Sequence, residues 1–425
     1  MSALVLPGNT GFPGGAQHLP RGQHVPVRPT CHRAEPTPRG VHIRLLVVES
    51  PASLPVLTAS FHDTLAGLRA HEPVSWIDDL GGWMVTSRDL VSVVLRDPVR
   101  FTVDDPRFST QRVIGPSMLS LDGPEHVRHR SPFDQTFRRG DPEELRARME
   151  GLAEGFVASL ADRQRADLRI SLAAPLAVAV MVDALGLVDV ATDELLGWYG
   201  AIVSSTTQTS LGASPSADGV AAMEELRGAV HRSLSSSDLL ARAGSSLAVN
   251  EIVSNVAVLL FGGVETSEAM TANALIHLLT EPGVIERLGH DPSLVSAFVE
   301  ESVRIEPAAA QLDRFATVDV TLGSTSIRAG DYVMCSIAAA NRDPAHFDDP
   351  TRFVLERPNA RTNLSFAVGP HACLATHVAK AETEAAVRAV LGGLKGVRLD
   401  LGEPAPRIEG IVFRKASSVP AAWGA

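Results

Sequence analysis

Cysteine is scarce in the 425-residue sequence, which excludes a fold held together by disulfide bonds. Its three cysteines, Cys31, Cys335 and Cys373, are too few and too scattered to form a disulfide framework. We therefore expect the protein to work in a reducing compartment, the cytoplasm. Long apolar runs are also missing, since the most apolar stretch, residues 176–188, is interrupted by Asp183 and is too short to cross a bilayer. The N-terminus lacks the apolar core of a secretory signal, so no membrane attachment is expected.

Lysine is as rare as cysteine, and arginine supplies almost all of the 38 basic side chains. Acidic residues outnumber the basic ones and give a net charge of −11 at pH 7. This charge argues against nucleic acid or an anionic membrane as the main partner. The rest of the composition, 45% hydrophobic and 20% charged residues, is that of a globular protein with a large core.

The first part of the chain differs from the remainder. Residues 1–50 are rich in Pro, Gly, Arg and His and show no periodicity, so we interpret them as a disordered N-terminal extension. Residues 51–425 are interpreted as a single domain, mainly α-helical with small β-sheets. The helical pattern covers 61–71 and nearly all of 141–305, and strand patterns occur at 73–87, 320–337 and in a final pair at 397–401 and 410–415.

One short stretch near the C-terminus, LSFAVGPHACLATHVAKAE (364–382), carries the strongest chemical signal. Phe366, Gly369, His371 and Cys373 stand at fixed short offsets just before an Ala-rich helical pattern. A cysteine in such a place can pack as a small apolar residue, ligate a metal or act as a nucleophile. Zinc would need a second pair of ligands, which the neighbouring sequence does not offer.

The string Phe-x-x-Gly-x-His-x-Cys resembles the haem-binding loop of the cytochromes P-450, the haem-thiolate monooxygenases. The resemblance implies that Cys373 is the proximal ligand to the iron of haem b, with a thiolate that favours O–O cleavage. It also implies that Phe366 shields the sulfur and that a helix from about Leu374 points its N-terminus at it. Two departures stand out, because Ala367 and Ala375 occupy positions where the family usually has glycine.

A second segment, LLFGGVETSEAM (259–270), places two glycines in the middle of a long helical pattern. Close packing against another helix would explain them. The segment also resembles the distal oxygen-binding kink of the same family. In that case the Thr266 hydroxyl reaches the carbonyl of Gly262 and bends the helix, with Gly263 beside it. The resemblance makes Glu265 and Thr266 the acid–alcohol pair that delivers protons to bound dioxygen.

Glu301 and Arg304, in VEESVRIEP (299–307), have the i, i+3 spacing of a helical ion pair. Such a pair is usually a surface feature. It also matches the family's Glu-x-x-Arg core pair, and the resemblance implies that Arg352 is the third member of a cluster that anchors the loop of Cys373.

His126 and Arg130 lie at i, i+4 in LDGPEHVRHR (121–130) and share one helix face, which on its own reads as a solvated basic surface. The resemblance implies that both donate hydrogen bonds to a haem propionate, together with Arg314 and His371.

The resemblance runs from about Glu72 to Trp423 and implies the helix-rich triangular prism of the family, with haem between distal and proximal helices. It implies an enzyme that takes O2, puts one oxygen atom into a small organic substrate and reduces the other to water. No flavin or nicotinamide fingerprint is present. We therefore expect a separate ferredoxin and ferredoxin reductase to supply electrons, and a monomeric enzyme.

Substrate contacts are expected from residues 101–120 and 197–218, which mix apolar and hydroxyl side chains and suit a medium-sized, partly polar molecule. Arg107 or Arg112 would meet a substrate carboxylate, or else lie in solvent. The arginine bias is typical of a GC-rich actinobacterial genome, which favours tailoring of a secondary metabolite by hydroxylation or epoxidation. Oxidative C–C or C–O coupling, desaturation and a non-catalytic scaffold are the alternatives, and the retained Cys373 argues against the last.

Overall fold

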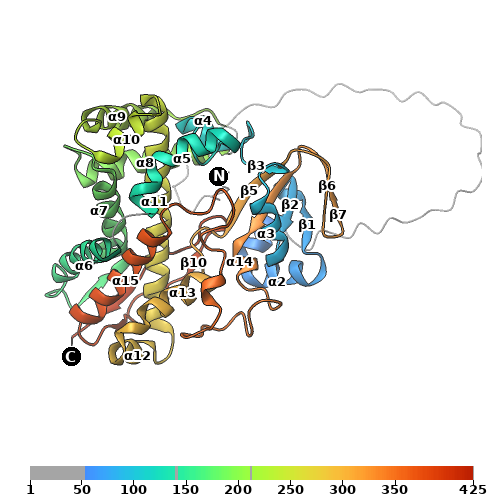
Figure 1. The fold of residues 1–425 in the computed structure, drawn as a ribbon. Coiled ribbons are helices and arrows are strands. Elements are labelled where there is room, and N and C mark those ends of the chain that lie inside the picture. Colours follow the sequence, from blue (N-terminus) through green and yellow to red (C-terminus); the bar gives the residue numbers. More distant parts are fainter. Residues whose placement is uncertain (1–52, 139–141, 211–212, 425) are drawn as a thin grey trace, which may run out of the picture.

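The computed structural model describes residues 53–138, 142–210 and 213–424, so Cys31 and the predicted extension, 1–50, lie outside the described residues (Figure 1). Helices make up most of the described residues, which confirms the predicted fold class, mainly α-helical with small β-sheets. The α-helices are α1 (Leu54–Ala59), α2 (Phe61–His71), α3 (Arg88–Arg96), α4 (Ser109–Ile114), α5 (Gly123–Arg138), α6 (Pro142–Ala158), α7 (Ala174–Leu185), α8 (Thr192–Ser210), α9 (Ala217–Ser233), α10 (Asp238–Gly244), α11 (Val249–Thr280), α12 (Val284–His290), α13 (Val295–Ile305), α14 (Ile337–Ala340) and α15 (Thr376–Gly393).

The strands are short and lie mostly on one side of the molecule (Figure 1). They are β1 (Val74–Ile77), β2 (Gly82–Val85), β3 (Phe101–Thr102), β4 (Arg165–Asp167), β5 (Gln311–Ala316), β6 (Val320–Leu322), β7 (Thr325–Ile327), β8 (Tyr332–Ser336), β9 (Arg398–Leu399), β10 (Ile408–Glu409), β11 (Lys415–Ala416) and β12 (Pro420–Ala422).

Helix α11 runs through the middle of the molecule, with α6 to α10 on one side and the main sheet on the other (Figure 1). Most of its 32 residues are buried, because α7, α9 and α15 pack around it. By length and composition alone this helix could cross a membrane, and among the described residues it alone passes that test. Since 78% of the relevant window is buried inside the protein, α11 is the central helix of the core.

The main sheet has five strands in the order β1-β2-β8-β5-β3. Strands β1 and β2 form the hairpin predicted at 73–87, and Gly81 between them has a left-handed backbone with φ 57°. Strand β2 then runs parallel to β8 and places Gly82 opposite Tyr332. A Cβ atom at Gly82 would lie 2.6 Å from the Tyr332 ring, so this close strand contact requires glycine.

Two details of the strand predictions are wrong. Strand β4 interrupts the predicted helical region and pairs with β12. The two segments predicted as a final pair of strands do not pair with each other, because β9 pairs with β12 and β11 pairs with β10. The chain turns tightly at the start of the second segment, where Gly410 has φ 103° and a Cβ atom would lie 1.9 Å from the Phe413 carbonyl oxygen.

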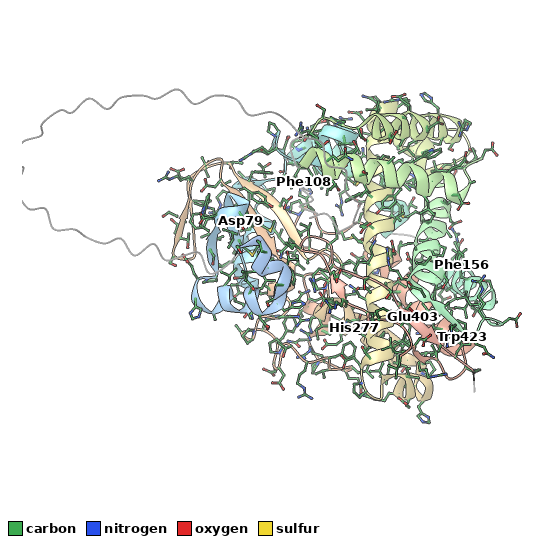
Figure 2. The ribbon with its side chains drawn as sticks, turned by 180° about the vertical axis from the view of Figure 1, so that it is seen from behind. Asp79, Phe108, Phe156, His277, Glu403 and Trp423 are labelled. Atoms are coloured by element: carbon green, nitrogen blue, oxygen red, sulfur yellow. The ribbon has the colours of Figure 1, made fainter. Side chains whose placement is uncertain are left out.

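The largest group of buried apolar side chains surrounds α11 and joins α6, α7, α13 and α15. Figure 2 shows Trp423, a member of this group that follows β12, and the partly buried Phe156 of α6, which packs against the group, on the helical side of the molecule. Smaller groups fill the space between the main sheet and helices α2 and α3. This arrangement leaves α11 with one face toward the sheet and the loops that follow it.

His277 lies buried in the last turn of α11, with 8% of its surface exposed (Figure 2). Its Nδ1 atom is 2.9 Å from the Ser302 hydroxyl of α13. Burial lowers the pKa of His277 to about 4, so the folded protein keeps this ring neutral over a pH range in which the unfolded chain protonates it.

We therefore expect a pH-dependent cost from His277. As the pH falls below about 6.5, the unfolded state takes up a proton that the folded state binds only near pH 4. Between pH 8 and pH 5, the wild-type free energy of unfolding should fall by about 2 kcal/mol more than that of His277→Gln. Urea denaturation at the two pH values measures the difference, and equal losses in both proteins would contradict the prediction.

Candidate functional site

A cavity of about 250 Å³, here called the inner cavity, lies between α11 and the loop that carries Cys373. Apolar side chains form most of its walls, including Phe108 and Met118 from the predicted substrate-contact segment 101–120. Eight of the predicted site residues line it: Arg130, Gly262, Gly263, Thr266, Arg314, Phe366, His371 and Cys373. The structure therefore brings together residues that are more than 200 positions apart in the sequence.

The loop of Cys373 is tightly folded. The Cys373 N–H donates to the Phe366 carbonyl at 2.8 Å and closes the loop. Gly369 has φ 83°, and a Cβ atom there would lie 2.4 Å from the Leu95 carbonyl oxygen, so only glycine fits against α3. Helix α15 begins at Thr376, two residues later than predicted. The half-buried thiol of Cys373 is thus held by its own loop at the wall of the inner cavity.

The two unusual alanines of this loop differ in backbone conformation. Ala367 has φ 55°, a left-handed conformation that costs a residue with a Cβ atom about 1–2 kcal/mol. Ala375 has φ −103° as the N-cap of α15, where alanine is unstrained. Of the two alanines, only Ala367 therefore strains the backbone of the loop.

Replacing Ala367 with glycine is expected to raise the free energy of unfolding by about 0.5–1 kcal/mol. The change removes the left-handed strain, while the greater freedom of the unfolded chain offsets about 0.4–1 kcal/mol of the gain. Ala375→Gly is the matched control, and it should leave stability unchanged or lower it. Chemical denaturation of both variants measures the difference, and a less stable Ala367→Gly protein would contradict the argument.

Thr266 faces the inner cavity from α11. Its hydroxyl donates to the Gly262 carbonyl at 2.5 Å, as predicted, but the helix is continuous from Val249 to Thr280. The packing interpretation also holds for the neighbouring glycine, since a Cβ atom at Gly263 would lie 2.1 Å from the Met181 sulfur. Gly262 thus leaves open space near Thr266, while Gly263 allows α7 to pack closely against α11.

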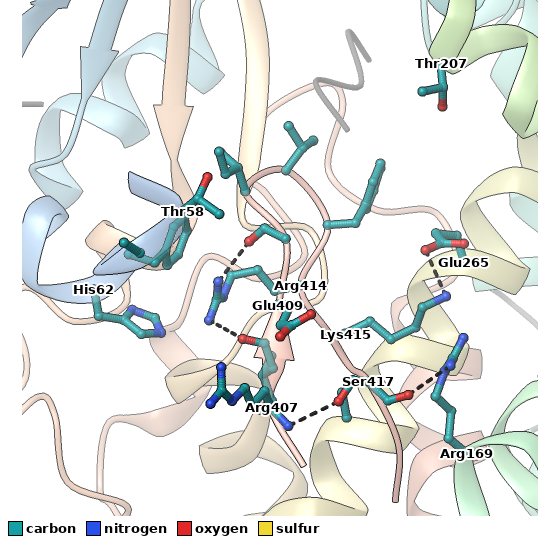
Figure 3. A pocket seen from close by; sticks show the side chains of 18 of the residues that line it. Thr58, His62, Arg169, Thr207, Glu265, Arg407, Glu409, Arg414, Lys415 and Ser417 are labelled. Atoms are coloured by element: carbon teal, nitrogen blue, oxygen red, sulfur yellow. Dashed lines mark hydrogen bonds and ion pairs between the residues drawn. The ribbon is translucent and has the colours of Figure 1, made fainter. Parts of the chain in front are cut away.

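Glu265 points in a different direction, into a larger outer cavity of about 1030 Å³ (Figure 3). The Lys415 ammonium lies 3.0 Å from its carboxylate, and the Tyr199 hydroxyl of α8 donates a hydrogen bond to it. Burial, together with this carboxylate, raises the pKa of Tyr199, so the phenol stays protonated as a donor. The predicted acid and alcohol therefore sit next to each other in sequence but face two cavities.

Cationic and hydrogen-bonding groups gather at one end of the inner cavity. His371 Nε2 lies 2.8 Å from Asp122, and burial lowers the pKa of His371 to about 4, which leaves it neutral at pH 7. Burial raises the pKa of Asp122, but hydrogen bonds from His371 and Thr102 outweigh this effect and bring it to about 2. The ring of His126 lies beside that of His371, with centroids 4.2 Å apart.

The two arginines of this group are held by backbone carbonyls. Arg130 donates to the Ala372 carbonyl at 2.6 Å, next to Cys373. Arg314 is 5% exposed and donates to the carbonyl of Asp313, and burial lowers the pKa of its guanidinium. A buried guanidinium beside an apolar cavity suits an anionic group of a bound molecule.

The predicted core ion pair is confirmed, but its third member is not the one expected. Arg304, fully buried, donates two hydrogen bonds of 2.7 Å to Glu301. Arg357, not Arg352, supplies the second guanidinium, at 3.0 and 3.1 Å from the two Glu301 oxygens. The side chain of Arg352 is 73% exposed and pairs with Asp349, because its backbone carbonyl is the group that faces inward and accepts from both buried arginines.

The arginines named as carboxylate ligands line neither cavity. Arg107 is exposed and pairs with Asp105 at 2.8 Å, and Arg112 lies 3.4 Å from the Thr209 carbonyl. From the segment 197–218, side chains of α8 line the outer cavity.

The inner cavity fits a haem held by one thiolate. Cys373 offers a sulfur at an apolar wall, and the guanidinium groups of Arg130 and Arg314 provide donors for carboxylates. Within the part of the chain that the structure describes, no three His, Cys, Asp or Glu side chains cluster closely enough to hold a metal ion. The donor set therefore favours a ligand that brings its own metal coordination and needs a single protein atom to complete it.

Comparison with known proteins places this site in a family. The family model for cytochrome P450 matches residues 223–396. The chain is 33% identical over 384 residues to mycinamicin IV hydroxylase/epoxidase of Micromonospora griseorubida, covering 85% of this chain and 96% of that protein. It is 32% identical to the cytochrome P450 monooxygenase PikC of Streptomyces venezuelae, covering 85% and 91% of the two chains.

The fold agrees with these sequence relatives. The crystal structure of CalO2 superposes with a TM-score of 0.78 at 28% identity, covering 87% of this chain and 97% of that one. Because relatives more than 30% identical span most of the chain and the same fold places Cys373 and Thr266 around one cavity, the chain belongs to the cytochrome P450 family of haem-thiolate monooxygenases.

Proposed function

We propose that the protein is a monooxygenase that inserts one oxygen atom from O2 into a small organic substrate and thereby hydroxylates or epoxidises a secondary metabolite. The observation that carries the proposal is the placement of Cys373 and Thr266 on the walls of one apolar cavity. The relatives support the substrate class, since they include a mycinamicin IV hydroxylase/epoxidase and a 20-oxo-5-O-mycaminosyltylactone 23-monooxygenase.

We assign the cofactor contacts to the residues around the inner cavity. Haem b, when bound, supplies the iron at which O2 is activated. Cys373 is the residue that ligates it, while Phe366 shields the sulfur. Arg130 and Arg314 donate to its propionates, while the neutral His371, whose N–H is used by Asp122, lines the same cavity with the ring of His126 beside it.

Protons are assigned a route across α11. Glu265 exchanges protons with solvent in the outer cavity, where Lys415 and Tyr199 hold its carboxylate. Thr266, the next residue of the same helical turn, presents its hydroxyl to the inner cavity. The acid thus remains in contact with water while the alcohol stays in an apolar space, which keeps bulk water away from the reacting atoms.

We also propose an electron donor, a cellular location and an oligomeric state for the enzyme. A separate ferredoxin, reduced by a ferredoxin reductase, delivers the two electrons that each turnover needs, because the sequence carries no nucleotide-binding fingerprint of its own. We propose a cytoplasmic monomer in which residues 51–425 act as one domain and residues 1–50 as an extension. The curated relatives support the domain, since they match 85% of this chain and nearly all of their own length.

The test is a carbon monoxide difference spectrum of the dithionite-reduced protein, followed by turnover with ferredoxin and ferredoxin reductase. A thiolate-ligated haem gives the long-wavelength Soret band for which the family is named, and oxygenated product should then appear with consumption of O2. Small molecules that shift the ferric Soret band identify substrate candidates for the turnover assay. A purified protein that stays colourless after haem supplementation would overturn the proposal.

A further inference from the structure

The inner and outer cavities share a wall. Phe261 of α11 lines both of them, while Glu265 and Thr266, one turn further along the helix, face the outer and the inner cavity respectively. The outer cavity, about 1030 Å³, is much the larger. If the wall between the two cavities opens, a molecule too long for the inner cavity extends into the outer cavity.

Two aromatic rings form the part of this wall nearest the C-terminal segment. The rings of Phe261 and Phe413 meet edge to face, with centroids 5.6 Å apart and planes at 77°. Phe413 lines the outer cavity, and its backbone pairs with that of Ala309, which lines the inner one. Phe413 therefore stands where the chain passes from one cavity to the other, at the end of the tight turn that begins at Gly410.

The walls of the outer cavity are mainly apolar, and three of its four arginine and lysine side chains pair with carboxylates. Lys415 pairs with Glu265 and Glu268, Arg169 pairs with Glu268 at 2.8 Å, and Arg414 pairs with Glu306. At its mouth the exposed Arg407 and Glu409 carry opposite charges (Figure 3). Apolar side chains lie between these groups, and five residues with hydroxyl groups also line the cavity: Thr58, Ser60, Thr206, Thr207 and Ser417.

This lining indicates what the outer cavity can bind. Paired charges offer no net attraction to an anion or a cation, whereas hydroxyls and alternating charges can donate to and accept from hydroxyl groups of a neutral ligand. Figure 3 shows Thr207 of α8 on the opposite side of this cavity from Arg407 and Ser417, so a ligand between them has polar partners on two sides.

We propose that Phe413, packed on Phe261, is a gate between the two cavities, and that the outer cavity holds the uncharged, hydroxyl-bearing part of an elongated substrate whose apolar part enters the inner cavity. This proposal rests on the proposed function in one respect, which is that a haem in the inner cavity fixes the position of one end of the ligand. Phe413 then determines which substrates enter according to their length. The hydroxyl groups of the outer cavity select substrates whose outer part is polar but uncharged.

Four imidazoles test the gate in the haem-loaded protein, because imidazole nitrogen binds the iron and changes its absorption spectrum. They are imidazole itself, 1-dodecylimidazole, 12-(imidazol-1-yl)dodecan-1-ol and 12-(imidazol-1-yl)dodecanoic acid. A long ligand must break the ring pair to pass, so Phe413→Ala should lower the Kd of the three long ligands roughly five- to tenfold. The Kd of imidazole itself, which stays in the inner cavity, should not change.

A matched control separates the gate from a general loosening of the protein. Phe353 is also a half-buried ring in an aromatic contact, with Phe298, and it lines neither cavity. Phe353→Ala should leave all four Kd values unchanged. Equal Kd changes for imidazole and the long ligands, or no change for any ligand in Phe413→Ala, would overturn the gate.

The terminal group of the long ligands tests the polarity of the outer cavity. In the wild-type protein the alcohol should bind more tightly than the methyl and carboxylate ligands, and Thr207→Val should reduce its advantage by roughly two- to tenfold, the effect of one hydrogen bond. Tightest binding by the carboxylate, lost in Arg407→Ala, would show an anion site and overturn this part. A failure of imidazole to change the spectrum would instead count against the proposed function.

Discussion

Cys373→Ser is expected to remove the long-wavelength carbon monoxide band and to lower turnover by at least about a thousandfold. A thiol with an ordinary pKa near 8.5 gives up its proton readily to bind a metal, whereas a serine hydroxyl does not and cannot supply the same electron density. The walls of the inner cavity remain intact in this variant, because the side chains differ by a single atom. The loss would therefore report on the sulfur itself.

Cys335→Ser is the matched control for this experiment. Cys335 lies fully buried in β8, and burial raises the pKa of its thiol to about 12, so it offers no thiolate at neutral pH. Its replacement should cost some stability, because it buries a hydroxyl, and should leave the carbon monoxide spectrum unchanged. Absorption spectra of both variants, taken at equal haem content, decide the matter. An unchanged spectrum in Cys373→Ser would refute the assignment of the ligand.

Arg357→Ala is expected to destabilise the fold by about 3–5 kcal/mol, because it removes several buried hydrogen bonds made by a charged group at once. Its guanidinium is 4% exposed and contacts both oxygens of Glu301, which also binds Arg304. The same side chain donates to backbone carbonyls of residues 348, 349 and 352, so its loss also leaves these groups without a donor.

Arg352→Ala provides the comparison, since the sequence alone pointed to Arg352. Its side chain is 73% exposed and pairs with an equally exposed aspartate, an arrangement worth at most about 1 kcal/mol. Its inward contacts are made by the backbone carbonyl, which alanine retains. Urea denaturation of both variants tests the assignment, and a larger loss in Arg352→Ala than in Arg357→Ala would contradict the structure.

The two arginines show how far the sequence could predict the site. Glu301 and Arg304 lie three residues apart on one helix, so their pairing follows from local geometry. Arg357 is 56 residues from Glu301, and only the folded chain brings it there. Arg352 resembled it in type and lay nearby in sequence, and no local pattern distinguishes an arginine that points inward from one that points to solvent.

The same distinction explains the site as a whole. The loop of Cys373, the hydrogen bond of Thr266 and the helical fold class depend on short-range spacing and were predictable. The partners of Glu265, namely Lys415 and Tyr199, come from other parts of the chain and left no signal near it. That Glu265 and Thr266 face different cavities was predictable in principle, because successive residues of an α-helix point about 100° apart.

The parallel pairing of β2 with β8 governs how the polypeptide matures during translation. The Trp83 indole N–H of β2 donates a hydrogen bond to the Asp331 carboxylate, 248 residues later in the chain. Because a ribosome adds about 5–20 residues per second, the β1–β2 hairpin is made roughly 10–50 s before β8 is available to pair with it. Until then it has an open edge, which is a template for aggregation. Such long-range pairing also makes folding slow. We therefore expect chaperones that shield this early hairpin to increase the yield of active enzyme in a cell.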